Sequence, residues 1–370
     1  MARLRLSLSA YLCYSRSYRI IMRAYLYNLA TDKSRGFLAA ILKFILLLLS
    51  FIYGLIIRTL IFISSLDLKR FEIRIISIGN ITVGGTGKTS LVEFISSHLK
   101  KRGHRIAILT RGYKRKGADA MGDEPRMLSK NLGDLPVIVD KDRARGAKRA
   151  IREYNSDTVI LDDGMQQWHI KKDLEIVTID ALNPFGNRHM LPRGILRQPL
   201  AYLKKADIFV LTKTNLAKNL DRLVSVLNKY NPKALIVESV HHPMGFYEIG
   251  KPQELFNVNY LKNKEVALLS GIGDPDSFSR LIASLGIKVG MDLRFSDHHN
   301  FTSGELKMIV GRVKESGIKV VVTTEKDAAR FLDQSLQIFD NLQFLVLRIE
   351  LKIVKNEELF FGRLFRLYSF

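Results

Sequence analysis

The sequence has almost no cysteine and far fewer acidic than basic residues. Cys13 is the only cysteine among 370 residues, which excludes an internal disulfide and a metal site built from several cysteines, and which suits a reducing cytosol. Only 36 acidic residues oppose 58 basic ones, so the formal net charge is +22. This imbalance indicates a polyanionic partner, which can be a nucleic acid, an anionic membrane surface or a phosphorylated substrate.

Acidic residues are scarcest in the basic N-terminal extension, residues 1–36, where Asp32 is the only one. Such a composition is compatible with an amphipathic segment on a membrane surface, with a transit peptide or with an over-long start of the reading frame. We identify no chemistry in this extension.

The run that follows, residues 37–63, is the most hydrophobic part of the chain and exceeds the length of about 20 residues that spans a bilayer. A single crossing with the rest of the chain in the cytosol would leave the basic extension outside, against the positive-inside tendency. We therefore favour a membrane helix over residues 37–64 that inserts shallowly, with Lys43 and Arg58 reaching the headgroups. A single span is the alternative, and a buried soluble helix is less favoured because the run is apolar on nearly all sides.

Residues 75–89 read IISIGNITVGGTGKT, a β-rich strand, a glycine turn and the start of a helix near Lys88. This order is typical of a phosphate-binding loop, because glycines let backbone N–H groups surround phosphate oxygens and the helix start adds positive potential. Lys88 would contact the outer phosphates, and the Thr89 hydroxyl would bind Mg²⁺. The loop departs from G-x-x-x-x-G-K-[ST] at its first position, Thr82. The predicted nucleotide-binding residues are Thr82, Val83, Gly84, Gly85, Thr86, Gly87, Lys88 and Thr89.

Two pairs of acidic residues follow the loop. A buried-type strand over residues 158–161 ends in Asp162 and Asp163, the arrangement of a Walker B motif, whose acid holds Mg²⁺ or its water shell. Asp123 and Glu124 lie in a glycine-bounded turn, where acids can offset a helix dipole or, beside a phosphate loop, serve as base or Mg²⁺ ligand. Both interpretations of that turn stay open.

Two basic segments lie between further predicted strands. The segment 111–117 follows a strand over residues 105–110, at the end of a sheet where ligands bind, although a solvated charge run is an equal alternative. Residues 184–194 form a long irregular stretch between strands 174–180 and 206–212. Its aromatic and apolar content favours a functional loop over a disordered one.

After residue 215 the strand–helix pattern restarts. Strands are predicted over residues 234–240, 266–270 and 320–324, with helices over 216–230 and 302–315. We therefore expect an α/β fold with a parallel-sheet P-loop domain, residues 65–215, and a second, smaller α/β domain, residues 216–370.

Two features of this second domain invite other interpretations. Residues 271–275 lack the G-x-G-x-x-G spacing, so we read them as a tight strand–helix turn and not as a dinucleotide site. His298 and His299 are adjacent, which disfavours joint binding of one metal ion. A histidine that orients a catalytic acid, or a structural histidine, is favoured instead.

Together these motifs resemble those of the tetraacyldisaccharide 4′-kinases, the membrane-bound kinases of bacterial lipid A biosynthesis. Within about residues 37–332 the family order is kept, and departures occur at Lys114, Met165 and Gln167, where Gly, Phe and His are usual. The matching segments are GNITVGGTGKT (79–89), TRGYKRKG (110–117), GDEP (122–125), DDGMQQ (162–167), FGNRHMLPRG with ILRQPL (185–200), SDHHNFT (296–302) and TTEKDAAR (323–330).

The resemblance implies an enzyme on the cytoplasmic face of the bacterial inner membrane. It implies transfer of the γ-phosphoryl group of ATP, with Mg²⁺, to the 4′-hydroxyl of tetraacyldisaccharide 1-phosphate. Asp123 is then the base, paired with His298, and Lys88 holds phosphate. The implied metal-site residues are Thr89, Glu124, Asp162 and Asp163.

Two other classes are less favoured. Membrane-associated P-loop ATPase switch proteins carry a lysine at the second loop position, which here is Val83. A nucleic-acid-binding NTPase would fit the charge, but the sequence has no interleaved aromatic–basic patch or recognised module. The expected partners are therefore an acylated disaccharide phospholipid and membrane lipids, without nucleic acid.

Overall fold

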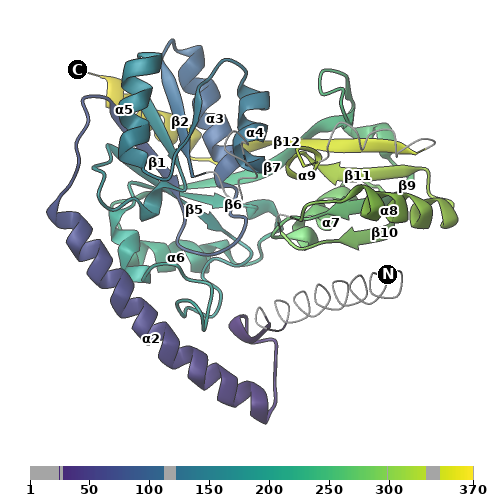
Figure 1. The fold of residues 1–370 in the computed structure, drawn as a ribbon, viewed down its shortest axis with the longest axis horizontal. Coiled ribbons are helices and arrows are strands. Elements are labelled where there is room, and N and C mark those ends of the chain that lie inside the picture. Colours follow the sequence, from purple (N-terminus) through teal and green to yellow (C-terminus); the bar gives the residue numbers. More distant parts are fainter. Residues whose placement is uncertain (1–24, 26–27, 112–121, 298, 331–341, 370) are drawn as a thin grey trace, which may run out of the picture. The chain divides into compact units, whose positions relative to one another are not determined.

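The chain was described with a computed structural model that covers residues 25, 28–111, 122–297, 299–330 and 342–369, the side chains of Asp123 and Glu124 excepted. The chain divides into two compact units, and Figure 1 labels most of their helices and strands. The small unit comprises residues 1–67, 81–83 and 183–204, and the large unit comprises residues 68–80, 84–182 and 205–370. The domain boundary expected near residue 215 stays a prediction.

The small unit contains the predicted hydrophobic helix, α2, which spans Phe37–Leu66. Its buried residues are Ala39, Ser50, Gly54 and Ile57, which form one stripe along the helix. Large apolar side chains cover the rest, and Phe44, Phe51 and Phe62 are 61%, 69% and 65% exposed. Within the described part of the chain, α2 is the one helix long and apolar enough to cross a membrane.

The large unit is built on one twelve-stranded sheet. In its first part the strand order is β3-β2-β4-β1-β5-β6-β7, and all neighbours are parallel. The predicted strands at 158–161 and 174–180 are confirmed within one residue at either end, and the strand expected at the start of the stretch 75–89 is β1. The strands are β1 (Arg74–Gly79), β2 (Ile106–Thr110), β3 (Val137–Val139), β4 (Thr158–Asp162), β5 (Leu174–Asp180), β6 (Ile208–Thr212) and β7 (Leu235–Glu248).

Helices cover both faces of this part of the sheet because successive strand residues point to opposite faces. Ile76 and Ile78 pack with Leu91 in the core beneath α3, whereas Ile75 packs with Ala147 in the core beneath α5. The helices are α3 (Lys88–Lys101), α4 (Asp123–Leu132), α5 (Arg143–Tyr154), α6 (Leu220–Tyr230) and α10 (Glu357–Phe365).

The second part of the sheet has the order β10-β9-β11-β12, again with parallel neighbours. The expected second parallel arrangement is therefore confirmed, but β12 also pairs antiparallel with β7 and joins both parts into one sheet. The elements are β8 (Leu255–Phe256), β9 (Glu265–Ser270), α7 (Pro275–Ser284), β10 (Lys288–Arg294), α8 (Ser303–Glu315), β11 (Val320–Thr324), α9 (Glu325–Ala328) and β12 (Gln343–Lys355).

The prediction that the strand after α6 ends at residue 240 was wrong. β7 continues to Glu248 through Pro243 and Gly245, two residues that usually end strands. The pairing with β12 shifts register between Arg348 and Ile349, opposite these two residues. Such a β-bulge lets a strand accommodate a proline without losing the neighbouring ladder bonds. Strands β3, β8, β10 and β12 and helices α5, α9 and α10 were not predicted.

A buried carboxyl lies on α3, the helix that follows the phosphate loop. Burial, together with the nearby charge of Glu325, raises the pKa of Glu93 to about 7, although Asn131 Nδ2 of α4 donates to Glu93 Oε2 at 3.3 Å. The folded protein therefore keeps a proton on Glu93 that the unfolded chain releases at its ordinary pKa of 4.5. It follows that the free energy of unfolding decreases as pH rises between these two values.

We predict that Glu93→Gln removes this slope and stabilises the protein by about 2 kcal/mol near pH 8, where the wild-type carboxyl is charged. Urea unfolding between about pH 5 and 8 measures it. Glu358→Gln, at an exposed position of α10, is the matched control and should keep the wild-type slope. An unchanged slope in Glu93→Gln would contradict the prediction.

Candidate active site

The phosphate loop connects β1 to α3, as the sequence predicts. Gly84 and Gly87 have φ angles of 126° and 80°, a region that residues with a Cβ rarely adopt. Gly87 is the N-cap of α3 and contributes no side-chain cap, and the first helical turn contains no acidic residue. The first amides of α3 and the positive end of its dipole are thus available to an anion.

Threonine side chains attach this loop to the neighbouring strands. Thr86 Oγ1 lies 2.8 Å from Thr178 Oγ1 of β5, and Thr178 Oγ1 donates to Gly79 O at 3.2 Å. Thr212 Oγ1 of β6 donates to Thr86 O at 3.2 Å. These buried hydrogen bonds attach the loop backbone at Thr86 to strands β1, β5 and β6 of the sheet.

Lys88 is held between a phosphate-loop residue and a Walker B residue. Its Nζ donates to Asn80 Oδ1 at 3.1 Å and lies 3.6 Å from Asp163 Oδ1. Gln166 Nε2 in turn donates to Asn80 O at 3.0 Å. Segments 79–89 and 162–167 therefore meet around one ammonium group, which two oxygen acceptors orient.

The Walker B segment reaches the loop because β4 lies beside β1, with Asp162 paired in register with Ile78. Asp162 is buried, whereas Asp163 is 39% exposed and has a left-handed φ of 57°. A side chain at Gly79 would overlap Met165, so glycine is needed where the two segments cross. Only a residue without a Cβ allows this approach.

The oxygen donors near Lys88 fit a magnesium ion. Thr89 follows Lys88 in sequence, and Asp163 Oδ1 lies 3.6 Å from Lys88 Nζ. Mg²⁺ binds through one or two carboxylates, waters and substrate phosphates. Among the described residues no group of three or more His, Cys, Asp or Glu side chains could hold a metal by itself. Thr89 and Asp163 are therefore donors of the kind that fit a metal shared with a nucleotide.

The structure does not describe the side chains of three predicted site residues. His298 is not described, and Asp123 and Glu124 are described only as the first backbone positions of α4. Lys114 and the rest of segment 112–121 also lie outside. Their roles remain predictions.

The residues Ile81–Val83 of the phosphate loop belong to the small unit. The Val83 N–H donates to Ile195 O at 2.8 Å, and the Arg197 N–H donates to Ile81 O at 2.7 Å. Thr82 forms an antiparallel bridge with Leu196 and is buried, while Val83 is 51% exposed. The irregular segment 184–194 thus leads directly into backbone that pairs with the phosphate loop.

Sequence reasoning missed a buried lysine at the end of β6. Lys213 Nζ lies 2.5 Å from Asp180 Oδ2, at the end of β5, and 2.5 Å from Asp274 Oδ2, the N-cap of α7. Lys213 is nearly fully buried and has a left-handed φ of 58°. The ion pair joins the two parts of the sheet beside the phosphate loop, and no local motif signals it.

The turn after β9 also lies beside the phosphate loop. A side chain at Gly273 would come within 3.4 Å of Gly85 N and 3.5 Å of Asp297 Oδ2. Asp327 and Arg330 hold the start of this turn, because the Gly271 N–H donates to Asp327 Oδ2 at 3.0 Å and Arg330 Nη1 donates to Gly271 O at 2.8 Å. The tight-turn prediction was right, and its position beside Gly85 was missed.

His241 of β7 lies under Gly87. A Cβ at Gly87 would be 3.2 Å from His241 Nε2 and from Thr212 Cγ2. Burial, and then the charge of Lys213, lowers the pKa of His241 to about 4, so its ring is neutral at pH 7. Among the described atoms its Nε2 has no hydrogen-bond partner.

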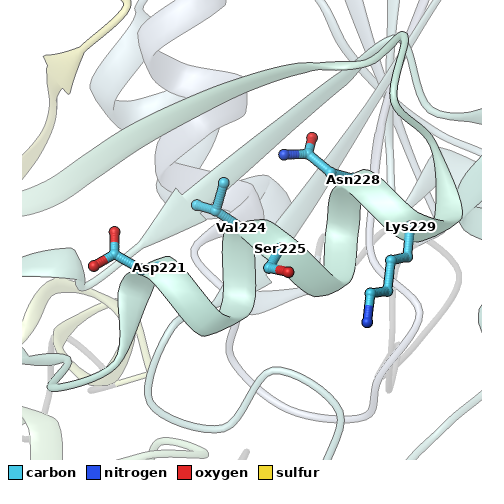
Figure 2. Close-up of a pocket in the computed structure, with 5 residues that line it drawn as sticks. All are labelled: Asp221, Val224, Ser225, Asn228 and Lys229. Atoms are coloured by element: carbon cyan, nitrogen blue, oxygen red, sulfur yellow. The ribbon is translucent and has the colours of Figure 1, made fainter.

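A shallow pocket elsewhere is formed by a single helix face. Figure 2 shows its lining on α6, and none of these residues belongs to a predicted motif. The lining residues are Asp221, Val224, Ser225, Asn228 and Lys229. We assign it no function.

Comparisons with known proteins agree with the motifs. A family model described as Tetraacyldisaccharide-1-P 4′-kinase matches residues 42–365. The tetraacyldisaccharide 4′-kinase of Halothermothrix orenii is 33% identical over 364 residues, covering 90% of this chain and 94% of that protein. That of Anaeromyxobacter dehalogenans is 36% identical over 301 residues, covering 77% and 79%. The crystal structure of LpxK from Aquifex aeolicus in complex with ATP has a TM-score of 0.66 at 27% identity, covering 89% of this chain and 100% of that chain.

We predict that Lys213→Met lowers the free energy of unfolding by about 3 kcal/mol, because it leaves Asp180 and Asp274 unpaired in a largely buried position. Adding Asp180→Asn and Asp274→Asn should restore part of the loss, since the uncompensated charges are then removed. Lys229→Met, on the exposed surface of α6, is the matched control. The measurement is guanidinium unfolding of the wild type, Lys213→Met, the triple variant and Lys229→Met. Equal free energies of unfolding for Lys213→Met and Lys229→Met would contradict the prediction.

Proposed function

Since this chain belongs to the tetraacyldisaccharide-1-P 4′-kinase family, we propose that it transfers the γ-phosphoryl group of ATP to the 4′-hydroxyl of tetraacyldisaccharide 1-phosphate in lipid A biosynthesis. The observation that carries the proposal is the position of Lys88, at a helix start within a glycine loop and 3.6 Å from the Walker B residue Asp163. ATP in the crystal structure of LpxK from Aquifex aeolicus supports the choice of nucleotide.

The chain's own groups suit phosphoryl transfer, whose loose transition state needs positioning and charge neutralisation more than covalent chemistry. Backbone amides of the loop 82–89 would surround the phosphates, except the Val83 amide, which donates to Ile195 O, and Lys88 would contact the outer phosphates. Asn80 and Asp163 hold the Lys88 ammonium in place before nucleotide arrives. Little reorganisation is then needed when negative charge develops on the transferred group.

Magnesium completes this arrangement in our proposal. Thr89, Asp162, Asp163 and Glu124 would hold the ion, which when bound neutralises phosphate charge. The exposed carboxylate of Asp163 supports this assignment, because it is already oriented through Lys88. The buried Asp162 fits a role in the water shell of the ion or in orienting Asp163.

Asp123 is proposed as the base that accepts the proton of the 4′-hydroxyl, and His298 as the residue that orients it. The support is the match of the segments GDEP and SDHHNFT to the family pattern. The closeness of Asp297 to the Gly273 turn, which itself approaches Gly85 of the phosphate loop, is compatible with a residue from segment 296–302 acting near the nucleotide.

The membrane-associated ATPase switch is less well supported. Proteins of that class need a lysine at the second loop position, whereas here Val83 occupies it and is half exposed. The family match over residues 42–365 also includes segments outside a nucleotide-binding core, such as 296–302 and 323–330.

We further propose that α2 lies in the cytoplasmic surface of the bacterial inner membrane and does not cross it. Ser50 Oγ, near the middle of α2, donates to Met190 O at 2.8 Å, and Tyr53 Oη donates to Arg197 O at 3.1 Å. Gly54 packs against Met190 Sδ. The irregular segment 184–194 is thus attached to the centre of the helix.

A spanning orientation would place this segment at the depth of the hydrocarbon core. Irregular backbone facing lipid does not occur there, because its polar groups have no water to bind. An in-plane helix puts the apolar side chains Phe44, Phe51 and Phe62 into the membrane and leaves segment 184–194 at the headgroups. Membrane lipids and the acylated acceptor are then reached from the same surface, and the net charge of +22 suits anionic headgroups.

We predict that Asp123→Asn lowers turnover by about 10²–10⁴-fold and leaves ATP binding intact, because a general base is lost and the phosphate loop is not. The measurement is transfer of labelled phosphate from ATP to a tetraacyldisaccharide 1-phosphate in detergent, with Mg²⁺. Asp134→Asn, at an exposed residue just after α4, is the matched control. Hydrolysis of ATP by the wild type without labelled lipid would refute the kinase assignment, and normal transfer by Asp123→Asn would refute the base.

A second prediction concerns α2. In a Cys13→Ser background, single cysteines at the exposed positions Phe37 and Leu66 mark the two ends of the helix. Both should react with a membrane-impermeant maleimide from the cytoplasmic side of inverted vesicles, because an in-plane helix has both ends on one side. Labelling of only one end from each side would show that α2 crosses the bilayer.

A further inference from the structure

Asp32, the only acidic residue of the N-terminal extension, accepts bonds from three side chains of the small unit. Its carboxylate lies 2.8 Å from Lys43 Nζ of α2 and 2.7 Å from Arg193 Nη2, and Asn187 Nδ2 donates to it at 3.2 Å. Burial would raise its pKa, but these hydrogen bonds lower the pKa of Asp32 to about 2, so the group is charged at pH 7. Its left-handed φ of 60° turns the chain immediately before α2.

The two loop partners of Asp32 are also bonded to each other. Asn187 Nδ2 donates to Arg193 O at 3.1 Å, which closes the segment between them into a compact turn. Arg193 Nη1 donates to Leu29 O at 3.3 Å, and the Leu29 side chain is buried. The end of the extension is therefore docked onto the segment 187–193, and Asp32 is the charge at the centre of that contact.

This contact continues into the phosphate loop through two residues of chain. Gly194 follows Arg193, and a side chain there would overlap Asn187 and the backbone of His189, so the turn leaves little freedom at this point. Ile195 comes next and accepts the N–H of Val83. All of these residues belong to the small unit. A change in the position of Arg193 would therefore move the backbone of Ile195, to which the Val83 amide of the phosphate loop is bonded.

We propose that Asp32 is a positioning residue for the kinase, which fixes segment 187–197 on α2 and thereby holds Ile81–Val83 in the conformation that binds ATP. This inference rests on the proposed function. Its consequence is that the end of the N-terminal extension contributes to nucleotide binding, although it carries no catalytic group. Segment 187–197 would then connect α2, the proposed membrane helix, to the phosphate loop.

The first test needs no activity. Hydrogen–deuterium exchange of the amides of Val83 and Arg197 should be slow in the wild type, because both donate within the small unit. Asp32→Asn should speed their exchange by about tenfold, since the charge-assisted bonds are weakened while asparagine still adopts the left-handed backbone. Asp67→Asn, at an exposed acid just beyond α2, is the matched control and should leave both amides unchanged.

The second test separates positioning from loss of fold. In the lipid-labelling assay, Asp32→Asn should raise KM for ATP by about three- to tenfold and leave kcat within about twofold, because only the loop that binds phosphate is loosened. Arg193→Gln should reproduce this change. The double variant should add little to it, because the two single variants break the same contact between Asp32 and Arg193.

The outcomes are distinguishable. Exchange and KM equal to the wild type in Asp32→Asn would overturn the inference, as would additive effects of the two single variants. A wild type that transfers no phosphate to the lipid would instead overturn the proposed function, and the exchange experiment would still decide whether Asp32 holds the loop.

Discussion

Gly79 brings the end of β1 against Met165 because it has no side chain, and this approach places the Walker B segment beside the phosphate loop. Asp163 can then reach the Lys88 ammonium, and Gln166 can bond to Asn80. Parallel pairing of β1 with β4 sets the direction of approach, and the missing Cβ sets its distance. The threonines of β5 and β6 add support from the other side, so the loop is held before any ligand binds.

Local patterns were enough to predict the phosphate loop, the strands around it and the hydrophobic helix, because each depends on residues close in sequence. Lys213 and Asp274 lie 61 positions apart, and Asp32 and Arg193 lie 161 apart. Each is an ordinary charged residue until the fold brings its partner near it. β12 was missed for a related reason, since nothing in its own residues shows that it lies between β11 and β7. Local reasoning left the roles of Asp123 and His298 open, and only the family resemblance paired them as base and orienting histidine.

The phosphate loop is held by two kinds of contact, which differ in how far they are exposed to solvent. In the large unit, buried hydroxyls and the ion pair of Lys213 act inside a sheet, where bonds are strong and little affected by salt. In the small unit, the supporting contacts of Asp32 are partly exposed, and salt or anionic headgroups compete with them. If Asp32 positions the loop as proposed, ionic conditions would act on Ile81–Val83 and leave the other end of the loop, at Thr86, unaffected.

The position of β12 between β11 and β7 has a consequence for biosynthesis. Translation delivers β7 well before β12, whereas β11 precedes β12 by only a short stretch of chain, and β7 and β11 do not pair with each other. Until residues 343–355 have been synthesised, β7 exposes an unpaired edge where β12 later pairs, and such an edge is a site for aggregation. Strands β1–β6 can meanwhile assemble as a parallel sheet. The phosphate loop, which lies between β1 and α3, is thus expected to form before β12 joins the two parts of the sheet.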